Sequence, residues 1–512
     1  MRFELNRIAI VATCSLIAGC MYLNVLMASP DPWTPGSKAR TETGAADFSV
    51  LADQSLQADT LPVPSWPRPA ESAVAIDPER TYALPELIDI AQRTRPATRA
   101  AWLRAREAAL AVDVVEATYL PQLSANVLAG AGRISQFASE IPELDIGAGS
   151  LTATGYQVVP SLAVEWLLFD FGMRDAAREV AEQTATAGDV AFNGVHQRVI
   201  FEVSEAYFEL TEARAETRIA RERLEDSRTL RSVAEGRLEE GLAIRVEVAQ
   251  ARQIEARAQF ELTLAERRDE SARAALMHAM GLSPTTAIQV ADLSDRRLPE
   301  RVPMPLEELI EVSLAQRPDI QVALSRARAA RSEVELVAAE SKPKIAAVAE
   351  VGRVLGRFSL QDSRFGGRAS MNRPLDEAVV GIVFKMPLFD GGRRQARQAQ
   401  ARLHAQAAEQ DLLEIRDAAA REIVHAYNLL HTSLAAYTAA GPLLEAGEET
   451  YETALGLYEN GLATLAEVSV SKIALNDARV LHAQAFADAF AAATALAFAA
   501  GRLTNRNVMS EL

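Results

Sequence analysis

Two stretches of the chain alternate apolar and polar residues with the period of two that a β-strand has. Their apolar faces are Leu162, Val164, Trp166 and Leu168 in the first stretch and, 220 residues later, Ile382, Phe384, Met386 and Leu388. On the opposite face Glu165 is matched by Lys385. One apolar and one charge-bearing face is the pattern of a membrane β-barrel, which has lipid outside and water inside. A half-buried strand in a soluble sheet has the same period, so the pattern alone leaves both open.

A further strand is expected after Pro121, where Leu123, Ala125, Val127, Ala129 and Ala131 share one face and Gln122, Ser124 and Asn126 the other. We therefore expect two strands in each half of the chain, and four in all. Closed membrane barrels start at about eight strands. An open strand edge in lipid leaves backbone groups unpaired, at several kcal/mol each. The chain therefore needs copies of itself to close a barrel.

Most of the remaining chain follows the helical period. A proline-free helix is expected from Gly172 to about Leu238, and its counterpart from Arg393 to about Tyr458, each roughly 100 Å long at about 1.5 Å per residue. Only the second contains Gly441-Pro442, where a kink or break is expected. Shorter helices are expected over Leu84 to just before Pro121, Val246–Met280, Leu306–Glu340 and Leu465–Ala500. Two short helices stacked end to end match one long helix, as in a cylinder wall built from unequal pieces.

The chain is duplicated. Residues 168–172 (Leu-Phe-Asp-Phe-Gly) return as residues 388–392 (Leu-Phe-Asp-Gly-Gly), 220 positions later, and upstream Arg95-Pro96 returns as Arg317-Pro318 at an offset of 222. We expect a first structural repeat over residues 82–303, a second over residues 304–505 and a short tail over residues 506–512. The predicted fold is mainly α with a small β part, in which each repeat contributes a long coiled-coil helical hairpin.

Charge and composition exclude several functions. The net charge of −16 and the pI near 5.1 argue against a nucleic-acid partner, because phosphate neutralisation needs basic stripes. The six histidines form no ligand pair, and no nucleophile accompanies a base. We therefore expect no catalytic residue, no metal site and no cofactor, and we expect that the protein is not an enzyme.

The N-terminus has the pattern of an export signal. Arg2 and Arg7 precede a charge-free run from Ile8 to Ala28, and Ile-Ala-Gly before Cys20 is the small-residue pattern that precedes a lipid-modified cysteine. We expect a signal peptide over residues 1–19, lipidation of Cys20, and an extended proline-rich tether over residues 20–81. Cleavage near Ala28 and a retained membrane anchor are the alternatives, since the apolar run is long enough to span a bilayer.

Together these features resemble the TolC-like outer-membrane efflux proteins, many of which carry a lipid-bearing N-terminal cysteine. The resemblance covers roughly residues 81–503 and rests on the duplication, the two hairpin turns, and the strand-exit motif at residues 386–392 with a weaker twin at residues 166–172. The strand-to-helix residues of these motifs are Phe169, Asp170, Gly172, Pro387, Phe389, Asp390, Gly391 and Gly392. The glycines let the chain swing from a tilted strand into a helix without a Cβ clash.

The resemblance implies a homotrimer whose strands together form a 12-strand β-barrel in the bacterial outer membrane, above an α-helical tunnel in the periplasm. It also implies that a periplasmic membrane-fusion adaptor docks at the hairpin tips, formed by Gly241, Leu242, Ala243, Gly461, Leu462, Ala463 and Thr464. Glu247 and Glu467 follow each turn at the place of a periplasmic gate in the family. The alternative is that both are solvated residues at a helix start, where the helix dipole favours them. Some members carry a further acidic residue three positions on, where this chain has Gln250 and Val470. The sequence therefore does not determine how tightly the gate closes.

The resulting prediction is the outer-membrane channel of a tripartite efflux system, a passive exit for substrates that an inner-membrane pump and the adaptor deliver. A type I protein-secretion duct and a membrane-anchored coiled-coil scaffold are the alternatives. A scaffold would leave the membrane with salt or alkali, whereas the channel would need detergent because outer-membrane lipid surrounds its barrel.

Overall fold

The computed structural model describes residues 76–138, 148–292, 298, 304–362, 368–371 and 374–504. The expected signal peptide, Cys20, the tether up to residue 75 and the C-terminal tail lie outside these residues. The fold is mainly helical with a small sheet, as the sequence predicted.

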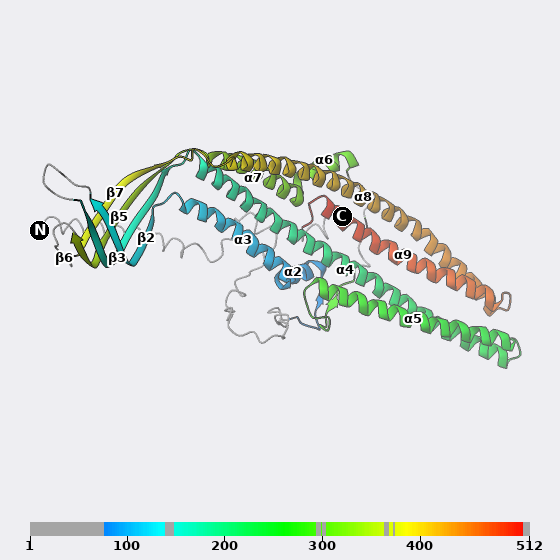
Figure 1. The fold of residues 1–512 in the computed structure, drawn as a ribbon. Helices are drawn as coiled ribbons and strands as arrows, with labels where there is room; N and C mark the ends of the chain where they lie inside the picture. The colour runs from blue at the N-terminus through cyan, green and yellow to red at the C-terminus, as the bar shows by residue number, and fades with distance from the viewer. Residues whose placement is uncertain are drawn as a thin grey trace. The chain divides into compact units, whose positions relative to one another are not determined.

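The helices and long strands occur twice in the same order, except that the last strand of the second set is in two pieces (Figure 1). The first set is α2 (Leu84–Thr94), α3 (Pro96–Ala117), β2 (Gln122–Ala138), β3 (Gly149–Phe169), α4 (Met173–Glu239) and α5 (Arg245–Ala279). The second set is α6 (Leu306–Gln316), α7 (Pro318–Ala339), β5 (Lys344–Asp362), β6 (Arg368–Met371), β7 (Leu375–Lys385), α8 (Arg393–Glu459) and α9 (Leu465–Ala499). Corresponding helices have equal lengths of 11, 22, 67 and 35 residues. A short parallel pair, β1 (Thr81–Tyr82) with β4 (Gln289–Val290), completes the set.

The single helices predicted before Pro121 and Pro343 are each divided in two. The division falls at Arg95, with ψ 124°, and at Arg317, with ψ 127°, and each of these residues precedes a proline. A proline disfavours the α conformation of the residue before it, because its Cδ clashes with the N–H and Cβ of that residue. The same proline is suited to begin the next helix, since its φ is already helical. The Arg-Pro pairs therefore make a corner at the same place in both repeats.

The helix α8 has no break at Gly441-Pro442, contrary to one of the two outcomes predicted there. It runs from Arg393 to Glu459 with Pro442 inside it. Proline removes one helical hydrogen bond and crowds the preceding turn. Packing on α9 offsets that loss on both sides of the proline: Leu434 is buried in a cluster with alanines of α9, and Gly447 lies against the backbone of Leu475.

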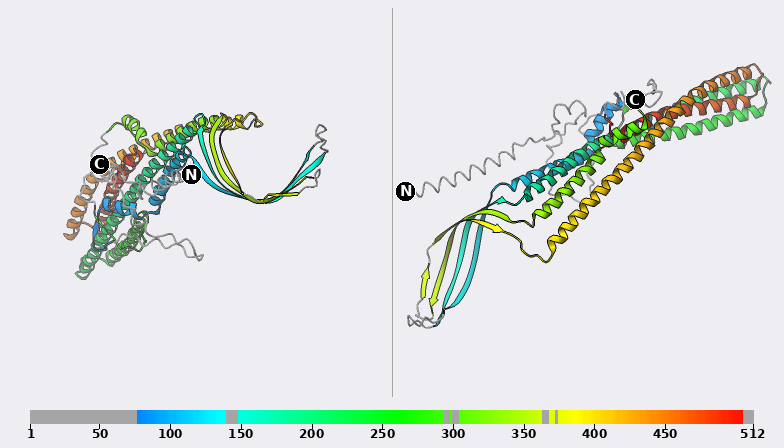
Figure 2. Two further views of the ribbon diagram at one scale, coloured as in Figure 1. Left: turned by 90° about the vertical axis from the view of Figure 1, so that its left-hand side faces the viewer. Right: turned by 90° about the horizontal axis from the view of Figure 1, so that it is seen from above.

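The five longer strands, β2, β3, β5, β6 and β7, form one antiparallel sheet (Figure 2). Its order is β2, β3, β5, and then β6 and β7, which pair with successive parts of β5. β6 and β7 are therefore two pieces of one strand, and the sheet has the four strand positions that the sequence predicted. Figure 2 shows these strands bowed along their length. β7 ends at Lys385, earlier than the predicted Leu388, because Pro387 has no N–H to continue the pairing.

The register collects apolar residues on one face of the sheet. Leu123, Val164, Ala349 and Val380 lie side by side in one row, and Ala125, Leu162, Val351 and Ala378 in the next. Val380 is 86% exposed in the single chain. Glu165, Glu350 and Glu377 alternate with these apolar residues along β3, β5 and β7 and therefore lie on the opposite face. The sheet thus has one apolar, uncovered face and one face that carries charged residues, with Lys344 and Lys385 at its helix end.

The chain forms two compact units. The second unit (Glu107–Gly188 and Ala323–Leu412) contains the sheet and the helix ends next to it. The first unit (Met1–Arg106, Asp189–Val322 and Leu413–Leu512) contains the helical hairpins. Its buried clusters centre on Tyr207, Phe208, Leu276 and Met280, and on Ile423, Leu430, Ala489 and Leu496.

Both Arg-Pro corners in the first unit are held against the end of a hairpin. Gly281 and Gly501 have φ 71° and 69°, and a Cβ built on Gly501 would lie 2.9 Å from Cα of Arg317. The Arg317 guanidinium donates to the Ala499 carbonyl, at 2.8 Å, and to the carboxylates of Asp319 and Glu422. Arg95 makes the matching ion pair with Glu202.

Replacing Gly501 with alanine should lower the free energy of unfolding by about 2–4 kcal/mol, because the new Cβ meets backbone and the φ value is unfavourable for alanine. The measurement is chemical denaturation of the purified chain in detergent. The matched control is Gly456→Ala inside α8, where nothing lies within 4 Å of the added Cβ. It should be neutral or stabilising by about 0.5–1 kcal/mol. Equal loss in both variants would contradict the role of the corner.

Candidate functional site

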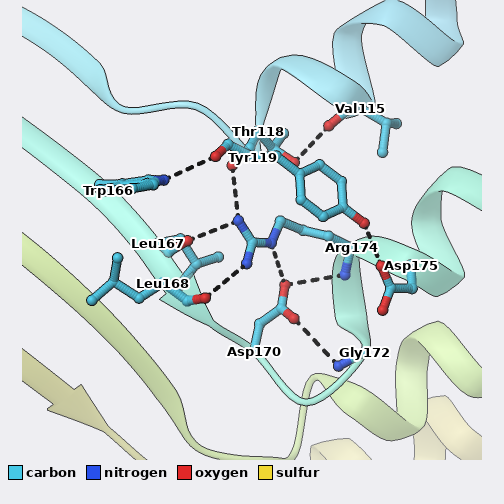
Figure 3. A network of polar contacts seen from close by, with 10 residues as sticks. All are labelled: Val115, Thr118, Tyr119, Trp166, Leu167, Leu168, Asp170, Gly172, Arg174 and Asp175. Atoms are coloured by element: carbon cyan, nitrogen blue, oxygen red, sulfur yellow. Dashed lines mark hydrogen bonds and ion pairs between the residues drawn. The ribbon is translucent and has the colours of Figure 1, made fainter.

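The end of β3 is joined to the start of α4 by the ion pair of Asp170 and Arg174 (Figure 3). The Arg174 side chain is 9% exposed, and its Nε donates to Asp170 Oδ2 at 2.8 Å. Asp170 also accepts from the backbone N–H of Gly172 and of Arg174, which otherwise have no partner at a helix start. One carboxylate therefore caps the helix and holds the guanidinium.

The same guanidinium collects backbone carbonyls where the strand ends. Nη1 donates to Leu167 O at 2.8 Å and to Thr118 O at 3.3 Å, and Nη2 donates to Leu168 O at 3.4 Å. The pairing of β3 with β5 changes register between Leu167 and Phe169, so the carbonyls there leave the regular ladder. Arg174 thus replaces sheet hydrogen bonds that are lost at this point.

Tyr119 covers the junction from the end of α3 (Figure 3). Its ring lies under the Arg174 guanidinium, 4.6 Å from its Cζ, and its hydroxyl donates to Asp175 Oδ1 at 2.6 Å. Burial and the acceptor Asp175 raise the pKa of Tyr119 to about 12. Trp166 Nε1 donates to the Tyr119 carbonyl at 2.9 Å, which fixes the indole at the end of the apolar face.

The second repeat contains the same contact between an aspartate and an arginine, which we call the clamp, but it has no aromatic ring in the place of Tyr119. Arg394 Nε lies 3.0 Å from Asp390 Oδ2, and its Nη atoms donate to the carbonyls of Pro387 and Leu388. Ser341 stands where the first repeat has Tyr119, and the Arg394 side chain is 28% exposed. The two junctions therefore share the hydrogen-bond pattern but differ in burial.

The residues between each aspartate and its helix have left-handed backbone conformations. Gly172, Gly391 and Gly392 have φ of 88°, 70° and 87°. Phe171 occupies the place of Gly391 with φ 56°, a conformation that costs a bulky residue free energy. Its ring packs edge-on against Phe169 with centroids 4.6 Å apart, a contact that Gly391 cannot make.

At their other ends the long helices turn through matching motifs. Leu242 N donates to Arg237 O and Leu462 N to Leu457 O, both at 2.8 Å, while Gly241 and Gly461 have φ 76° and 73°. This is the Schellman arrangement, in which a left-handed glycine satisfies the last helical carbonyls. The predicted tip residues thus form two alike turns with exposed leucines, Leu242 and Leu462.

The two acidic residues after the turns differ in their contacts. Glu467 forms a capping box: its carboxylate accepts from Thr464 N at 2.6 Å, and its own N–H donates to Thr464 Oγ1 at 3.3 Å. The backbone hydrogen bond from Thr464 lowers the pKa of Glu467. The cap therefore adds stability above the usual pH range of a glutamate and loses it as pH falls through the lowered pKa. In the first repeat the position of Thr464 is occupied by Ile244, so α5, which contains Glu247, starts without a side-chain cap.

Sequence reasoning missed the contacts that join the two hairpins. Arg237 Nη1 donates to Tyr458 O at 3.1 Å, and its guanidinium lies 4.8 Å from the Tyr458 ring centre. Tyr458 is buried in a cluster with Ala234, Val248, Ala251, Leu465 and Val468. Farther from the hairpin turns, Lys472 forms an ion pair with Asp226 and lies over the Tyr451 ring. None of these pairs has a fixed sequence spacing, so no motif could have revealed them.

The clamp arginines were also missed as a pair, although the 220-residue repeat that relates Arg174 to Arg394 was available. In the part of the chain that the structure describes, no three His, Cys, Asp or Glu side chains gather as a metal site.

Comparisons place this geometry among known proteins. Residues 87–282 and 309–502 match the family model described as outer membrane efflux protein. Over 470 residues the chain is 29% identical to protein CyaE of Bordetella pertussis, covering 91% of this chain and 92% of that protein. It is 27% identical over 366 residues to the pyoverdine export outer membrane protein OpmQ of Pseudomonas putida, covering 69% and 72%. The fold is similar to the crystal structure of the outer membrane protein VceC of Vibrio cholerae, with a TM-score of 0.65, 21% identity and coverage of 82% and 96%.

Replacing Arg174 with methionine should lower the free energy of unfolding by about 3–5 kcal/mol, because it leaves Asp170 charged and buried without its partner. Arg394→Met should cost less, about 1–2 kcal/mol, since water reaches the second junction. Denaturation in detergent measures both variants. Equal losses would contradict the difference in burial between the junctions.

Proposed function

The chain belongs to the outer membrane efflux protein family, and we propose that it is the outer-membrane channel of a tripartite efflux system. Substrates delivered by an inner-membrane pump and a periplasmic adaptor leave through it by diffusion. The observation that carries this proposal is the four-position sheet, whose apolar face is uncovered and whose outer edges, on β2 and on β6 with β7, have no strand partner among the described residues.

The edges support a trimer. Positions one and four of an antiparallel sheet run in opposite directions, so β7 of one copy can pair antiparallel with β2 of the next. Three copies supply the 12 strands of a closed barrel, and closure removes every edge. On β3 the apolar face runs from Trp166 to Tyr156, and these ten steps at about 3.3 Å and a tilt of about 40° give roughly the 25 Å of a lipid band bounded by aromatic residues.

One charged pair lies within the proposed lipid band. Arg353 and Asp376 are opposite each other on β5 and β7, with Nε to Oδ1 at 2.6 Å and Nη2 to Oδ2 at 3.2 Å. A lone arginine at mid-membrane costs about 2–4 kcal/mol on the lipid face of a barrel. The two-point ion pair neutralises both groups, which makes their place on this face tolerable.

We assign the adaptor contact to the hairpin turns formed by Gly241, Leu242, Ala243, Gly461, Leu462, Ala463 and Thr464. Exposed leucines at two alike turns are suited to a protein partner, because apolar side chains at a loop tip gain from burial in a complex. We assign a periplasmic gate to Glu247 and Glu467, since carboxylates around a constriction favour cations and control passage.

We further assign lipidation to Cys20 on the strength of the signal pattern, with the tether after it leading to the first repeat. The acyl group and the barrel would then both hold the chain in the outer membrane, and the helical hairpins would extend into the periplasm.

The full chain should require detergent for extraction, have the mass of a trimer by light scattering, and form ion-conducting pores in planar bilayers. Cys20→Ser should lose the acyl mass in mass spectrometry and keep the trimer, because strand pairing holds the copies together. A monomer, or release by alkali, would refute the channel and favour the scaffold.

In the same bilayers Glu247→Gln and Glu467→Gln should each lower the preference for cations over anions. The glutamines keep the side-chain size, and glutamine at position 467 keeps the capping box, so the change isolates charge. Unaltered selectivity and conductance in an intact trimer would rule out the gate assignment.

A further inference from the structure

The apolar face of the sheet becomes basic from the row of Tyr156 onward. Arg357 of β5 is opposite Tyr156, and Arg133 of β2 is opposite Thr154. Arg368 of β6 is opposite Gln361, which lies four residues beyond Arg357 on the same strand. Directly opposite residues share a face, and so do residues an even number of positions apart. The three arginines therefore lie on the face that carries the apolar band, Arg357 at its end and Arg133 and Arg368 beyond it.

These charges are not neutralised by the described chain. All three arginines are exposed. The guanidinium groups of Arg133 and Arg357 make no ion pair within the described residues, and Arg368 has one long contact, Nη2 to Gln361 Oε1 at 3.4 Å. In the three rows of Tyr156, Thr154 and Thr152, no described residue on this face is acidic. The described residues between these rows, which lie on the other face, include no arginine or lysine.

The surroundings of the arginines suit a phosphate group. Hydroxyl side chains fill the same rows, with Ser135 Oγ 3.1 Å from Thr152 Oγ1 and Ser359 Oγ donating to Thr154 O. Arginine forks bind phosphate oxygens in pairs, and hydroxyls add further donors. Arg133 and Arg357 lie two strands and one row apart, roughly 12 Å between their Cα atoms, so both side chains can reach one headgroup above the Tyr156 ring.

We propose that Arg133, Arg357 and Arg368 form a basic collar that binds the phosphate groups of lipid A in the outer leaflet. The inference rests on the proposed function, because the rows form a collar only when three copies close the barrel. The other ends of β3 and β7 lead into α4 and α8, the periplasmic side of the proposed channel, so the Tyr156 end lies at the outer leaflet. The collar fixes the height of the barrel in the membrane, with Tyr156 at the boundary between acyl chains and headgroups.

The test titrates the detergent-purified full-length trimer with lipid A that carries both phosphates and follows the midpoint of thermal unfolding. The variant combines Arg133→Gln, Arg357→Gln and Arg368→Gln. Its matched control combines Arg104→Gln, Arg326→Gln and Arg402→Gln, three exposed arginines on helices. The collar variant should need on the order of 100-fold more lipid A for the same shift, and the control should behave as the unmodified chain. Dephosphorylated lipid A, or inorganic phosphate at equal concentration, should give little shift.

An unchanged lipid A response in the collar variant would overturn the proposal, and so would equal stabilisation by dephosphorylated lipid A or by inorganic phosphate alone. Pore formation by the collar variant separates the two levels of inference. If the unmodified chain and the variant both form trimeric pores but respond alike to lipid A, only the collar fails. If the unmodified chain forms no trimer and no pore, the channel itself fails.

Discussion

The need to pair backbone groups is the constraint on which the rest of this molecule depends. Four strand positions leave two edges, and each edge carries N–H and C=O groups that lipid cannot satisfy. A face such as that of Val380 and Ile382 cannot remain in water, because it is both apolar and extensive. The proposed trimer answers both problems, because identical sheets would pair edge to edge and turn their apolar faces outward. Under this proposal, assembly is a condition for a stable sheet and also the origin of the pore.

The ends of the strands meet the same constraint in a local form. A sheet that stops must leave carbonyl groups without ladder partners, and here an arginine from the first turn of the following helix collects them. Asp170 and Asp390 make this possible, because each caps its helix and holds the arginine at once. The result is a stiff connection between a strand and a helix that would otherwise be joined by a flexible loop. A stiff connection matters in the proposed channel, since the barrel and the helices must keep a common bore.

Much of this architecture could be predicted from sequence because it is periodic. The strand alternation, the long helical periods and the 220-residue repeat are all one-dimensional signals, and the lengths they gave agree with α4, α5, α8 and α9. The differences from the predicted element boundaries came from proline, whose effect depends on context. At Arg95-Pro96 the proline ends a helix that periodicity alone would continue. Pro442, in contrast, lies inside α8, which stays helical because it packs on α9. The contacts of Arg237 and Lys472 join segments far apart in sequence, so only the folded chain reveals them.

The two repeats agree in every helix length and differ in local chemistry, and the contrast separates what assembly requires from what it tolerates. If six long helices from three copies form one wall, a difference of one turn between α4 and α8 would leave a step of about 5 Å at one end of every second helix. Side chains at the junctions and turns face no such restriction. Tyr119 can become Ser341, Phe171 can become Gly391, and Ile244 can become Thr464 without changing the path of the backbone. The halves can therefore specialise, with one junction buried and the other open to water, and one hairpin capped and the other uncapped. Equal helix lengths with unequal side-chain contacts are therefore what the proposed wall would require of its two repeats.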